Sequence, residues 1–341
     1  MSSTVTLGDL ALTLGVSKTL ISLVLNNKGT TYGISQATQK KVFKLAKKLN
    51  YQPNLVARGL REGKTNTVGL VVSDIANPFY SKMARHIEDF LSAKDYHLVI
   101  CSTDEEPERE HKIIKLMREK QFDGIIVSTS QRKTGDFKQL MREKYPFVLI
   151  DRKIKSIKTN FIGINNFQAT YQAVKYLIGE GYSQIAAMAV SPVYVSSIKE
   201  RIKGYRHAMA DSGFDLTQQR LVEIPFDKVK TAVKTEIQKL IQSPHPVNAL
   251  FAINNNIAVA CLEAFRELQI ALPKDIAFIA FDDIDAFRLT TPTVTAIDQP
   301  LEEICQHAVD ILLNEIARPR RAKKEIILSP SLIIRQSVKK L

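Results

Sequence analysis

An alternation of short apolar runs with amphipathic segments, which begins near residue 67, is the feature that most constrains how this chain can fold. The apolar runs fall into two series, at 68–73, 97–102, 124–128 and 147–151, and then at 185–189, 221–224, 249–253 and 277–281. Apolar strands separated by helices form parallel sheets that are covered on both faces. The pattern predicts an α/β core of two lobes, each with a doubly wound parallel sheet and with a changeover near Gly163.

Polar residues follow several of these runs directly. They are Asp74 and Asn77 after the first run, with Phe79 close by, Asp151 and Arg152 after the fourth, Asn254 after 249–253, and Asp282 after 277–281. Ligands of such sheets bind beyond the carboxyl ends of the strands. Each residue alone could be an ordinary loop residue, but together they favour a pocket for a small molecule rich in hydroxyl and amide groups.

The first 64 residues form a distinct basic segment. They contain ten Lys and Arg but only Asp9 and Glu62 as acidic residues, so they carry a net charge of +8 out of +13 for the chain. A small basic segment of this kind is typical of nucleic-acid binding. A basic surface without a nucleic-acid partner would have the same charge. The charge therefore does not distinguish the two, and the helix pattern of this segment is needed.

Three short helices are predicted before residue 51. Thr6 can cap the first, with Asp9 at its third position and Gly15 at its end. Ser17 can cap the second helix, and the third begins at Ser35 and extends to about residue 50. Two short helices joined by a tight turn match a helix-turn-helix, with a plain three-helix bundle as the alternative.

In a helix-turn-helix the second helix enters the major groove and presents its first residues to base edges. Here these residues are Ser17, Lys18, Thr19 and Ser22. A Lys can donate to a guanine edge, and a Thr can contact a thymine methyl or a hydrogen-bonding group.

The motifs in this segment resemble the headpiece of the LacI/GalR family of repressors. The matching residues are 5–11, 15–17, 21–26, Ser35, Thr38, Val42, Leu49, Tyr51, Pro53 and Asn54. The resemblance implies that DNA is faced by Thr6, Ser17, Lys18, Thr19, Ser22, Asn26, Thr38, Tyr51 and Asn54. The sequence departs from the family in two places. Leu23 replaces an Arg that is usual in the family. The loop 27–34 is about three residues longer than in a relative, and its Tyr32 is placed to reach the phosphate backbone.

Residues 52–64 form a linker. Asn54 can cap a short helix, but Gly59 lowers its helix propensity by ~1 kcal/mol, and so short a helix is marginal alone. The resemblance implies that two such hinge helices of a homodimer become ordered in the minor groove, with Leu60 wedged between base pairs and Ala57 beside it. A plain flexible linker is the alternative.

The resemblance continues over the core at 74–80, 150–152, 201–206 and 281–283. It implies a periplasmic-binding-protein-like fold in which Arg201 and Asp282 are the principal effector contacts. Phe79, Asp151, Asn254 and Gln299 are expected nearby, and Phe226 lies near the place of an aromatic that stacks on the effector. An Arg fork and a carboxylate can orient a sugar or a nucleobase.

This core also departs from the family pattern at two asparagines and where Cys305 or Gln306 replaces an expected glycine. Asn165 and Asn255 stand where Asp is usual. The loss of these carboxylates would suit a less basic or more anionic effector, or it is a structural change.

These patterns divide the chain into three parts. The expected limits are 1–51 for the helix-turn-helix, 52–64 for the hinge, and 65–341 for the core, with one lobe at about 65–163 and 296–325 and the other at about 164–295 and 326–341. A paired hinge and a palindromic operator require two-fold symmetry, so we expect a homodimer. The expected function is transcriptional repression controlled by a sugar or sugar derivative, with a purine or nucleoside as the alternative effector.

Other classes of protein fit the sequence less well. A solute-binding protein of similar fold would have a signal peptide, which the N-terminus lacks, and no basic headpiece. An enzyme would be expected to show a phosphate loop, a nucleophile elbow or a zinc motif, and the sequence has none of them. The three cysteines are odd in number and far apart, and no apolar run approaches ~20 residues. We therefore expect a cytoplasmic protein with no membrane partner, metal or cofactor.

Overall fold

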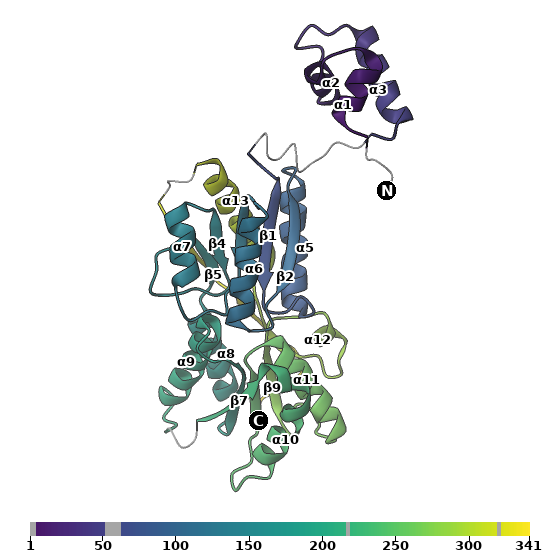
Figure 1. Cartoon of the computed structure of the whole chain (residues 1–341). Coiled ribbons are helices and arrows are strands. Elements are labelled where there is room, and N and C mark those ends of the chain that lie inside the picture. The colour runs from purple at the N-terminus through teal and green to yellow at the C-terminus, as the bar shows by residue number, and fades with distance from the viewer. Residues whose placement is uncertain (1–4, 52–62, 216–218, 319–321) are drawn as a thin grey trace. The chain divides into compact units, whose positions relative to one another are not determined.

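The computed structural model describes residues 5–51, 63–215, 219–318 and 322–341 (Figure 1). The chain divides into two compact units, residues 1–65 and 66–341, and each is described by itself.

The first unit is a small helical domain of α1 (Leu7–Leu14), α2 (Lys18–Leu25) and α3 (Gln36–Lys48). All three predicted N-caps are confirmed. In α1 the Thr6 side chain accepts from the Asp9 amide while the Asp9 carboxylate accepts from the Thr6 amide, which is a capping box. The helix ends at Gly15, whose φ of 62° is the left-handed conformation that glycine adopts most readily.

One apolar cluster holds these three helices together. Its fully buried members are Leu10 and Ala11 of α1, Ile21 and Val24 of α2, and Val42 of α3. Partly buried residues three or four positions away, such as Leu7, Leu14 and Leu45, pack against them, so each helix faces the cluster with one side.

The first lobe of the second unit is built on a sheet whose strands are all parallel. Their order is β11 (Glu325–Leu328), β5 (Phe161–Ile164), β4 (Phe147–Ile150), β3 (Gly124–Val127), β1 (Thr67–Val72) and β2 (His97–Ser102). Successive residues of β1 show why both faces are covered: Leu70 packs with α5 (Pro78–Ser92) and α13 (Leu301–Ala317), whereas Val71 packs with α6 (Pro107–Glu119) and α7 (Gly135–Glu143).

The second lobe repeats this plan. The strand order is β12 (Ser331–Ile333), β10 (Thr295–Asp298), β9 (Ala277–Phe281), β8 (Ala249–Ala252), β6 (Ile185–Ser191) and β7 (Arg220–Pro225), with only β12 antiparallel. The helix pairs α8 (Asn166–Gly179) with α9 (Ser196–Ala210), and α10 (Val229–Ile241) with α11 (Asn255–Glu267), pack against this sheet. A short turn η1 (Phe226–Lys228) precedes α10, and α12 (Ala286–Leu289) follows β9 (Figure 1). The two-lobed α/β fold with doubly wound sheets is confirmed.

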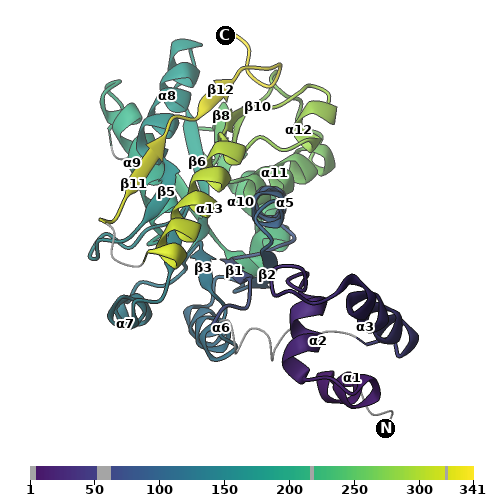
Figure 2. The same ribbon diagram turned by 90° about the horizontal axis from the view of Figure 1, so that it is seen from above.

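The chain crosses between the lobes three times, after β5, after β10 and after β11 (Figure 2). The predicted limits of the lobes need correction at two of these crossings. β10 belongs to the second sheet, although residues from 296 on were assigned to the first lobe, and β11 belongs to the first sheet although it extends beyond 325. Both are short strands near or at sheet edges, and the half-exposed pattern of β11 carries little periodic signal.

Within the described ranges, no single helix has the length and hydropathy needed to cross a membrane. The pair α1 and α2 meets that test only when the two are taken together across a 110° bend.

Candidate DNA-contacting surface and interlobe cavity

The turn between α1 and α2 sets the geometry of the helical unit. The two helices bend by 110° across residues 15–17, within the range of about 90–120° that a helix-turn-helix uses. Ser17 caps α2 by accepting from the Leu20 amide at 3.1 Å. Ser17, Lys18 and Thr19 are exposed, so the first turn of α2 is open to a partner.

The other predicted DNA-facing residues of this unit have local roles as well. Asn26 donates to the Ser22 carbonyl at 2.7 Å, and the hydroxyls of Thr38 and Ser35 lie 2.9 Å apart at the start of α3. The Thr6 hydroxyl donates to Asp9 at 2.8 Å, and hydrogen bonds from Thr6 lower the pKa of the Asp9 carboxyl. These contacts fix the orientation of the side chains before any partner binds.

Three further predicted positions lie at or beyond the end of this unit. Tyr51 is half-buried against the apolar cluster. Asn54, Ala57 and Leu60 fall in 52–62, outside the described residues. Leu23, where the family usually has Arg, is half-buried on α2, and Tyr32 in the loop 27–34 is 64% exposed.

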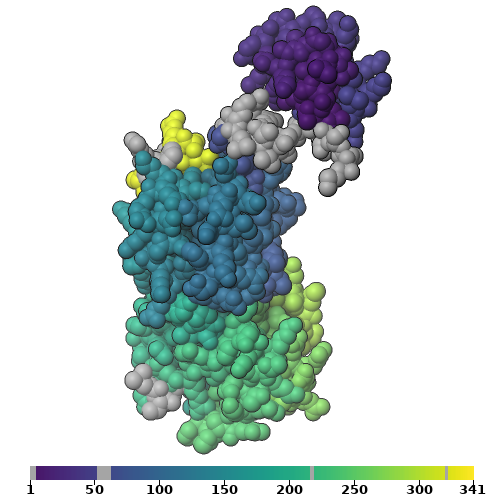
Figure 3. Space-filling model, in the orientation of Figure 1, coloured from purple at the N-terminus to yellow at the C-terminus, as the bar shows by residue number. Residues whose placement is uncertain are grey.

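In the second unit, a cavity lies between the two lobes. Its lining comes from the ends of strands and from α5 and α9, and consists of Ser73, Asn77, Phe79, Tyr80, Glu105, Asp151, Arg152, Val190, Ser197, Ile198, Arg201, Phe226, Asn254, Asn256 and Asp282. Its volume is about 30 Å³, room for about two water molecules, whereas drug-sized ligands occupy ~300 Å³ or more. The atoms of the two lobes meet closely on the face shown in Figure 3. The lobes therefore stand in a closed arrangement.

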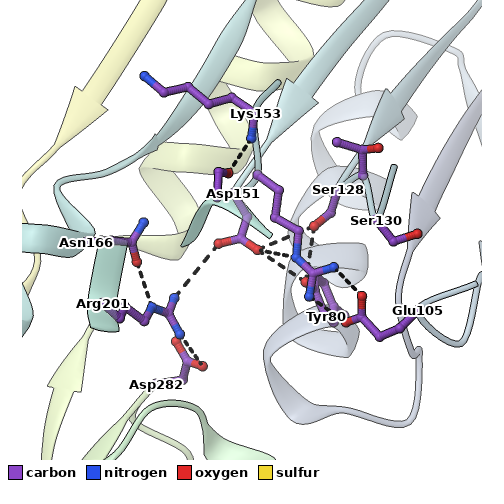
Figure 4. A network of polar contacts seen from close by, with 12 residues as sticks. Tyr80, Glu105, Ser128, Ser130, Asp151, Lys153, Asn166, Arg201 and Asp282 are labelled. Carbon is purple, nitrogen blue, oxygen red and sulfur yellow. Dashed lines mark hydrogen bonds and ion pairs between the residues drawn. The ribbon is translucent and has the colours of Figure 1, made fainter. Parts of the chain in front are cut away.

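Arg201 of α9 lies at the centre of this cavity, almost fully buried (Figure 4). Its Nε donates to Asn166 Oδ1 at 2.7 Å and its Nη1 to the Ile253 carbonyl at 2.8 Å. The guanidinium stacks 3.5 Å from the centre of the Phe281 ring. These contacts hold the fork in one orientation.

Two carboxylates flank that guanidinium at longer range. Asp282 Oδ2 is 3.8 Å from Nη1, and Asp151 Oδ1 is 4.0 Å from Nη2. Burial raises the pKa of Asp282, although Arg201 and a hydrogen bond from Gln299 act in the opposite direction. Gln299 donates to Asp282 Oδ1 at 2.6 Å, so it holds this carboxylate from behind.

A second buried arginine completes the network (Figure 4). Arg152 donates from Nη1 and Nη2 to the two oxygens of Glu105 at 2.8 and 2.7 Å, which is a bidentate pair. Its Nε is 3.5 Å from Asp151 Oδ2, which also accepts from the Tyr80 hydroxyl at 3.2 Å. The other oxygen of Asp151, Oδ1, is buried and has no hydrogen-bond partner among the described residues.

The three acidic residues of the lining share an uncommon backbone conformation. Glu105, Asp151 and Asp282 have φ values of 59°, 61° and 69°, in the left-handed region that non-glycine residues seldom adopt. Such positions persist where the surroundings enforce them, and they gather at binding sites.

The structure brings most of the predicted effector-site residues together. Those in the lining are Asn77, Phe79, Asp151, Arg152, Arg201, Phe226, Asn254 and Asp282. Asp74 and Gln299 are not in the lining. Asp74 instead accepts from the Ala76 amide at 2.8 Å and stabilises its own turn, and Gln299 contacts Asp282.

Sequence reasoning missed several members of this site. Glu105 follows the carboxyl end of β2, so the strand-end rule that selected Asp151 applied to it equally. Tyr80 and Asn166 had no comparable signal, because each reaches the network only through tertiary packing.

The two asparagines that depart from the family pattern have structural partners. Asn165 caps α8 by accepting from the Gln168 amide at 3.0 Å. Asn255 donates to Asn77 Oδ1 at 2.7 Å and so joins the lobes, while its own Oδ1 is buried without a hydrogen-bond partner in the described part of the chain.

A larger depression, of about 580 Å³, lies between α6 and α7 and is lined by residues that include His111, Arg118 and Asp136. It contains none of the predicted effector residues. The smaller interlobe cavity is the candidate ligand site, because it gathers buried charged groups at strand ends, where open α/β sheets bind ligands. Among the described residues, no group of His, Cys, Asp and Glu is arranged to hold a metal ion.

Comparison with known proteins gives matches to both units. The model for bacterial regulatory proteins of the lacI family matches residues 6–54, and the model for a periplasmic binding protein-like domain matches residues 174–338. The HTH-type transcriptional regulator DegA of Bacillus subtilis is 31% identical, over 98% of this chain and 98% of its own. The HTH-type transcriptional repressor PurR of Photobacterium profundum is 30% identical, over 98% and 99%. A solved LacI family transcriptional regulator from Enterococcus faecium, with bound ribose, is 27% identical with a TM-score of 0.72, and the match covers 81% of this chain and 99% of that one.

Proposed function

This chain belongs to the lacI family of bacterial regulatory proteins, and on that premise we propose that it binds a palindromic operator as a homodimer and responds to an effector in the interlobe cavity. It is a DNA-binding transcriptional regulator. The effector that we propose is a sugar or sugar derivative, with a purine as the second candidate.

One observation carries the DNA-binding part of the proposal. The exposed start of α2 stands at 110° to α1 inside a segment with a net charge of +8. A first turn that is capped by Ser17 and exposes Lys18 and Thr19 suits entry into the major groove. The charge supplies the sequence-independent attraction to phosphates.

Selection from random DNA, followed by gel-shift titration of the full-length protein, tests this function. We expect a palindromic site to bind at least ~10³-fold more tightly than random DNA at physiological salt. Equal affinity for every palindrome and for random DNA would show that the proposal is wrong.

Leu60 provides a sharper test of the hinge. Its replacement by Ala removes the proposed wedge, so affinity for the selected site should fall more than affinity for random DNA. Leu12→Ala is the matched control, because Leu12 is 88% exposed and lies outside the proposed DNA face. Equal losses of specific and non-specific affinity in Leu60→Ala would contradict a wedge.

Exposed apolar residues near one edge of the core support a homodimer. β2 ends the first sheet and carries Val99 and Ile100, which are 38% and 39% exposed, and Leu289 of α12 is 84% exposed. Helix α5 packs beside β2, and its Lys82 forms an ion pair with Asp285, next to α12. The exposed apolar residues of β2 and of α12 therefore lie on either side of α5. Apolar groups gathered in this way mark protein interfaces.

Sedimentation measurements test this assignment. Ile100→Asp should give a monomer that has lost affinity for the palindromic site. Ile334→Asp, at an apolar residue that directly follows β12 and is 58% exposed, should remain dimeric. A dimeric Ile100→Asp variant would exclude this edge as the interface.

The chemistry of the cavity supports a sugar or a purine. Asp151 and Asp282 accept from hydroxyl or ring N–H groups, Arg201 donates, and Phe79 and Phe226 provide apolar surface for a ring. The E. faecium structure contains ribose, which favours the sugar, and the PurR relatives favour the purine. Thermal-shift screening of both classes decides between them, since a bound ligand raises the melting temperature.

The effector acts on DNA binding by linkage. If it changes the affinity for the operator by some factor, the operator changes the affinity for the effector by the same factor. We further propose that the protein works in the cytoplasm by binding alone, so steady turnover of a bound sugar or nucleoside would contradict this part.

A further inference from the structure

Arg152, in the lining of the cavity, has a carboxylate next to each edge of its guanidinium. Glu105 engages both of its Nη atoms, and Asp151 faces its Nε at 3.5 Å. The side chains of Arg152 and Glu105 are 6% and 5% exposed, so water screens this pair poorly. The Nη1/Nη2 fork is therefore not available for a bidentate contact with phosphate, and a phosphate at the remaining edge would have to compete with Asp151.

Arg201, the other arginine of the lining, is committed as well. Its Nε and Nη1 donate to Asn166 and to the Ile253 carbonyl, and two carboxylates lie within 4.0 Å. The described lining contains three acidic residues, two arginines and no lysine. Its formal charge is −1, and a phosphate group would add further negative charge to a site of low dielectric.

In the lining, the buried side-chain atoms without a hydrogen-bond partner among the described residues are the acceptor Asp151 Oδ1 and the donor Arg152 Nε, which Asp151 Oδ2 faces at 3.5 Å. Next to the lining, Asn255 Oδ1, beside Asn77, is a further unpartnered acceptor. Unpaired buried acceptors are costly until a ligand donates to them. Hydroxyl groups and ring N–H groups are such donors, and phosphate oxygens are not.

The backbone at Glu105 indicates that its position matters. Asp104 and Glu105 are two consecutive residues with φ values of 53° and 59°. This backbone conformation is unfavourable for residues other than glycine. At these two positions it accompanies the contact between the Glu105 carboxylate and Arg152 (Figure 4).

We propose that Glu105 is a charge filter, which occupies Arg152 and thereby restricts the effector to an uncharged, unphosphorylated molecule that donates hydrogen bonds. This inference rests on the proposed effector role of the interlobe cavity. It adds the class of molecule that the cavity rejects.

The test compares Glu105→Gln with Glu106→Gln in the full-length protein. Both changes remove one acidic charge, but Glu106 is exposed and outside the lining. The probe is inorganic phosphate at about 5 mM against chloride of equal ionic strength, a concentration too low for general salting effects. Calorimetry should give a rise of about 3 °C or more in the core transition of Glu105→Gln alone.

Further variants and measurements make the outcome decisive. In Glu105→Gln with Arg152→Met, the phosphate-induced rise should disappear, because the freed guanidinium is gone. Equal responses of Glu105→Gln, Glu106→Gln and the wild type to phosphate would overturn the proposal. If Glu105→Gln does not fold, the wild type is titrated with ribose 5-phosphate and inosine 5′-monophosphate. Saturable one-to-one binding would overturn the proposal, and the absence of binding up to about 10 mM would support it.

These results are separable from the test of the proposed function. Operator selection with the wild type measures DNA recognition without any effector. A wild type that prefers no palindrome refutes the regulator and leaves the phosphate comparison valid, whereas equal phosphate responses refute the filter and leave operator binding intact.

Discussion

Replacement of Arg201 by Met removes the cation that lies between Asp151 and Asp282. The variant keeps an unbranched chain of similar length next to Phe281 but loses the bonds to Asn166 and to the Ile253 carbonyl. Loss of one partner from a buried charge cluster costs about 3–5 kcal/mol. The carboxylates keep other partners, so we expect the lower end of this range, about 3 kcal/mol.

The loss should depend on pH, with a sign fixed by Asp282. Burial raises the pKa of this carboxyl and Arg201 opposes the rise, so the pKa in the variant lies higher still. A carboxyl with a raised pKa favours the folded state while it is protonated, below its unfolded value, and loses that contribution as pH rises through its folded value. Arg201→Met should therefore be most destabilised above that pKa, and the deficit should shrink as the pH falls.

Calorimetry at pH 7.5 and pH 5.0 measures both effects. At pH 7.5 we expect the core transition to fall by about 6 °C, since a core of this size shifts by about 2 °C for each kcal/mol. At pH 5.0 about 1 kcal/mol or more of the deficit should be recovered, which corresponds to one unit of pKa. Adding Asp282→Asn to the variant should restore stability at pH 7.5 and flatten the pH dependence.

Arg206→Met is the matched control on the same helix, because Arg206 is exposed. It should stay within about 0.5 kcal/mol of the wild type at both pH values. An equal deficit of Arg201→Met at pH 7.5 and 5.0 would refute the electrostatic explanation and leave only lost packing and hydrogen bonds.

Other parts of the molecule give further predictions. Gly204→Ala should destabilise the core by about 2 kcal/mol, because a Cβ there would lie 2.4 Å from the Phe167 carbonyl oxygen. Gly179→Ala has open space around it and should stabilise the core by about 0.5 kcal/mol. Calorimetry that gives the opposite order of stability would contradict both expectations. Thr6→Ala should lower the stability of the helical unit by about 1 kcal/mol in circular-dichroism melts, since it removes the hydroxyl that accepts from the Asp9 amide and donates to the Asp9 carboxylate. An unchanged melt would show that this side-chain cap contributes nothing. Lys18→Met should relax base preference at one operator position, which is measured by binding to sites mutated one base pair at a time. An equal loss of affinity for every site would instead indicate that Lys18 contacts a phosphate.

The features that sequence predicted well are those with local causes. The caps at Thr6, Ser17 and Ser35 follow from side chains that bond an amide three residues ahead, and Gly15 follows from the left-handed conformation. Buried parallel strands have uniform apolar runs, so their positions are visible as well. The edge strands β11 and β12 are short and half-exposed, and their pairing depends on segments far away in the sequence.

The cavity was predictable only in part, for a related reason. Strand ends mark the residues that can point into it, which is why Asp151 and Asp282 were found. The pairing of those residues is a tertiary property: nothing in the sequence near Arg152 indicates that Glu105, 47 positions earlier, takes up its guanidinium. The same limit applies to Asn255, which sequence comparison marked as a change of charge and the structure shows as a bond between lobes.

The closed cavity sets what an effector has to do. The lobes are joined by polar contacts, which include Tyr194 to the Ser130 carbonyl at 2.9 Å, the Lys153 amide to Ser196 at 2.8 Å, and Asn255 to Asn77 at 2.7 Å. Each such bond contributes about 1 kcal/mol net, so these three contribute a few kcal/mol to closure, in addition to ion pairs such as Lys82–Asp285 and Lys155–Glu200. A ligand of sugar size cannot enter about 30 Å³, so the lobes must part before it can bind between them. A ligand shifts the equilibrium between two states only by the difference in its affinity for them. If the free energy of closing is small, a few hydrogen bonds to the ligand are enough to change the populations of the open and closed states. On the proposed function, the opening and closing of these lobes is the step at which a small uncharged effector would act on DNA binding.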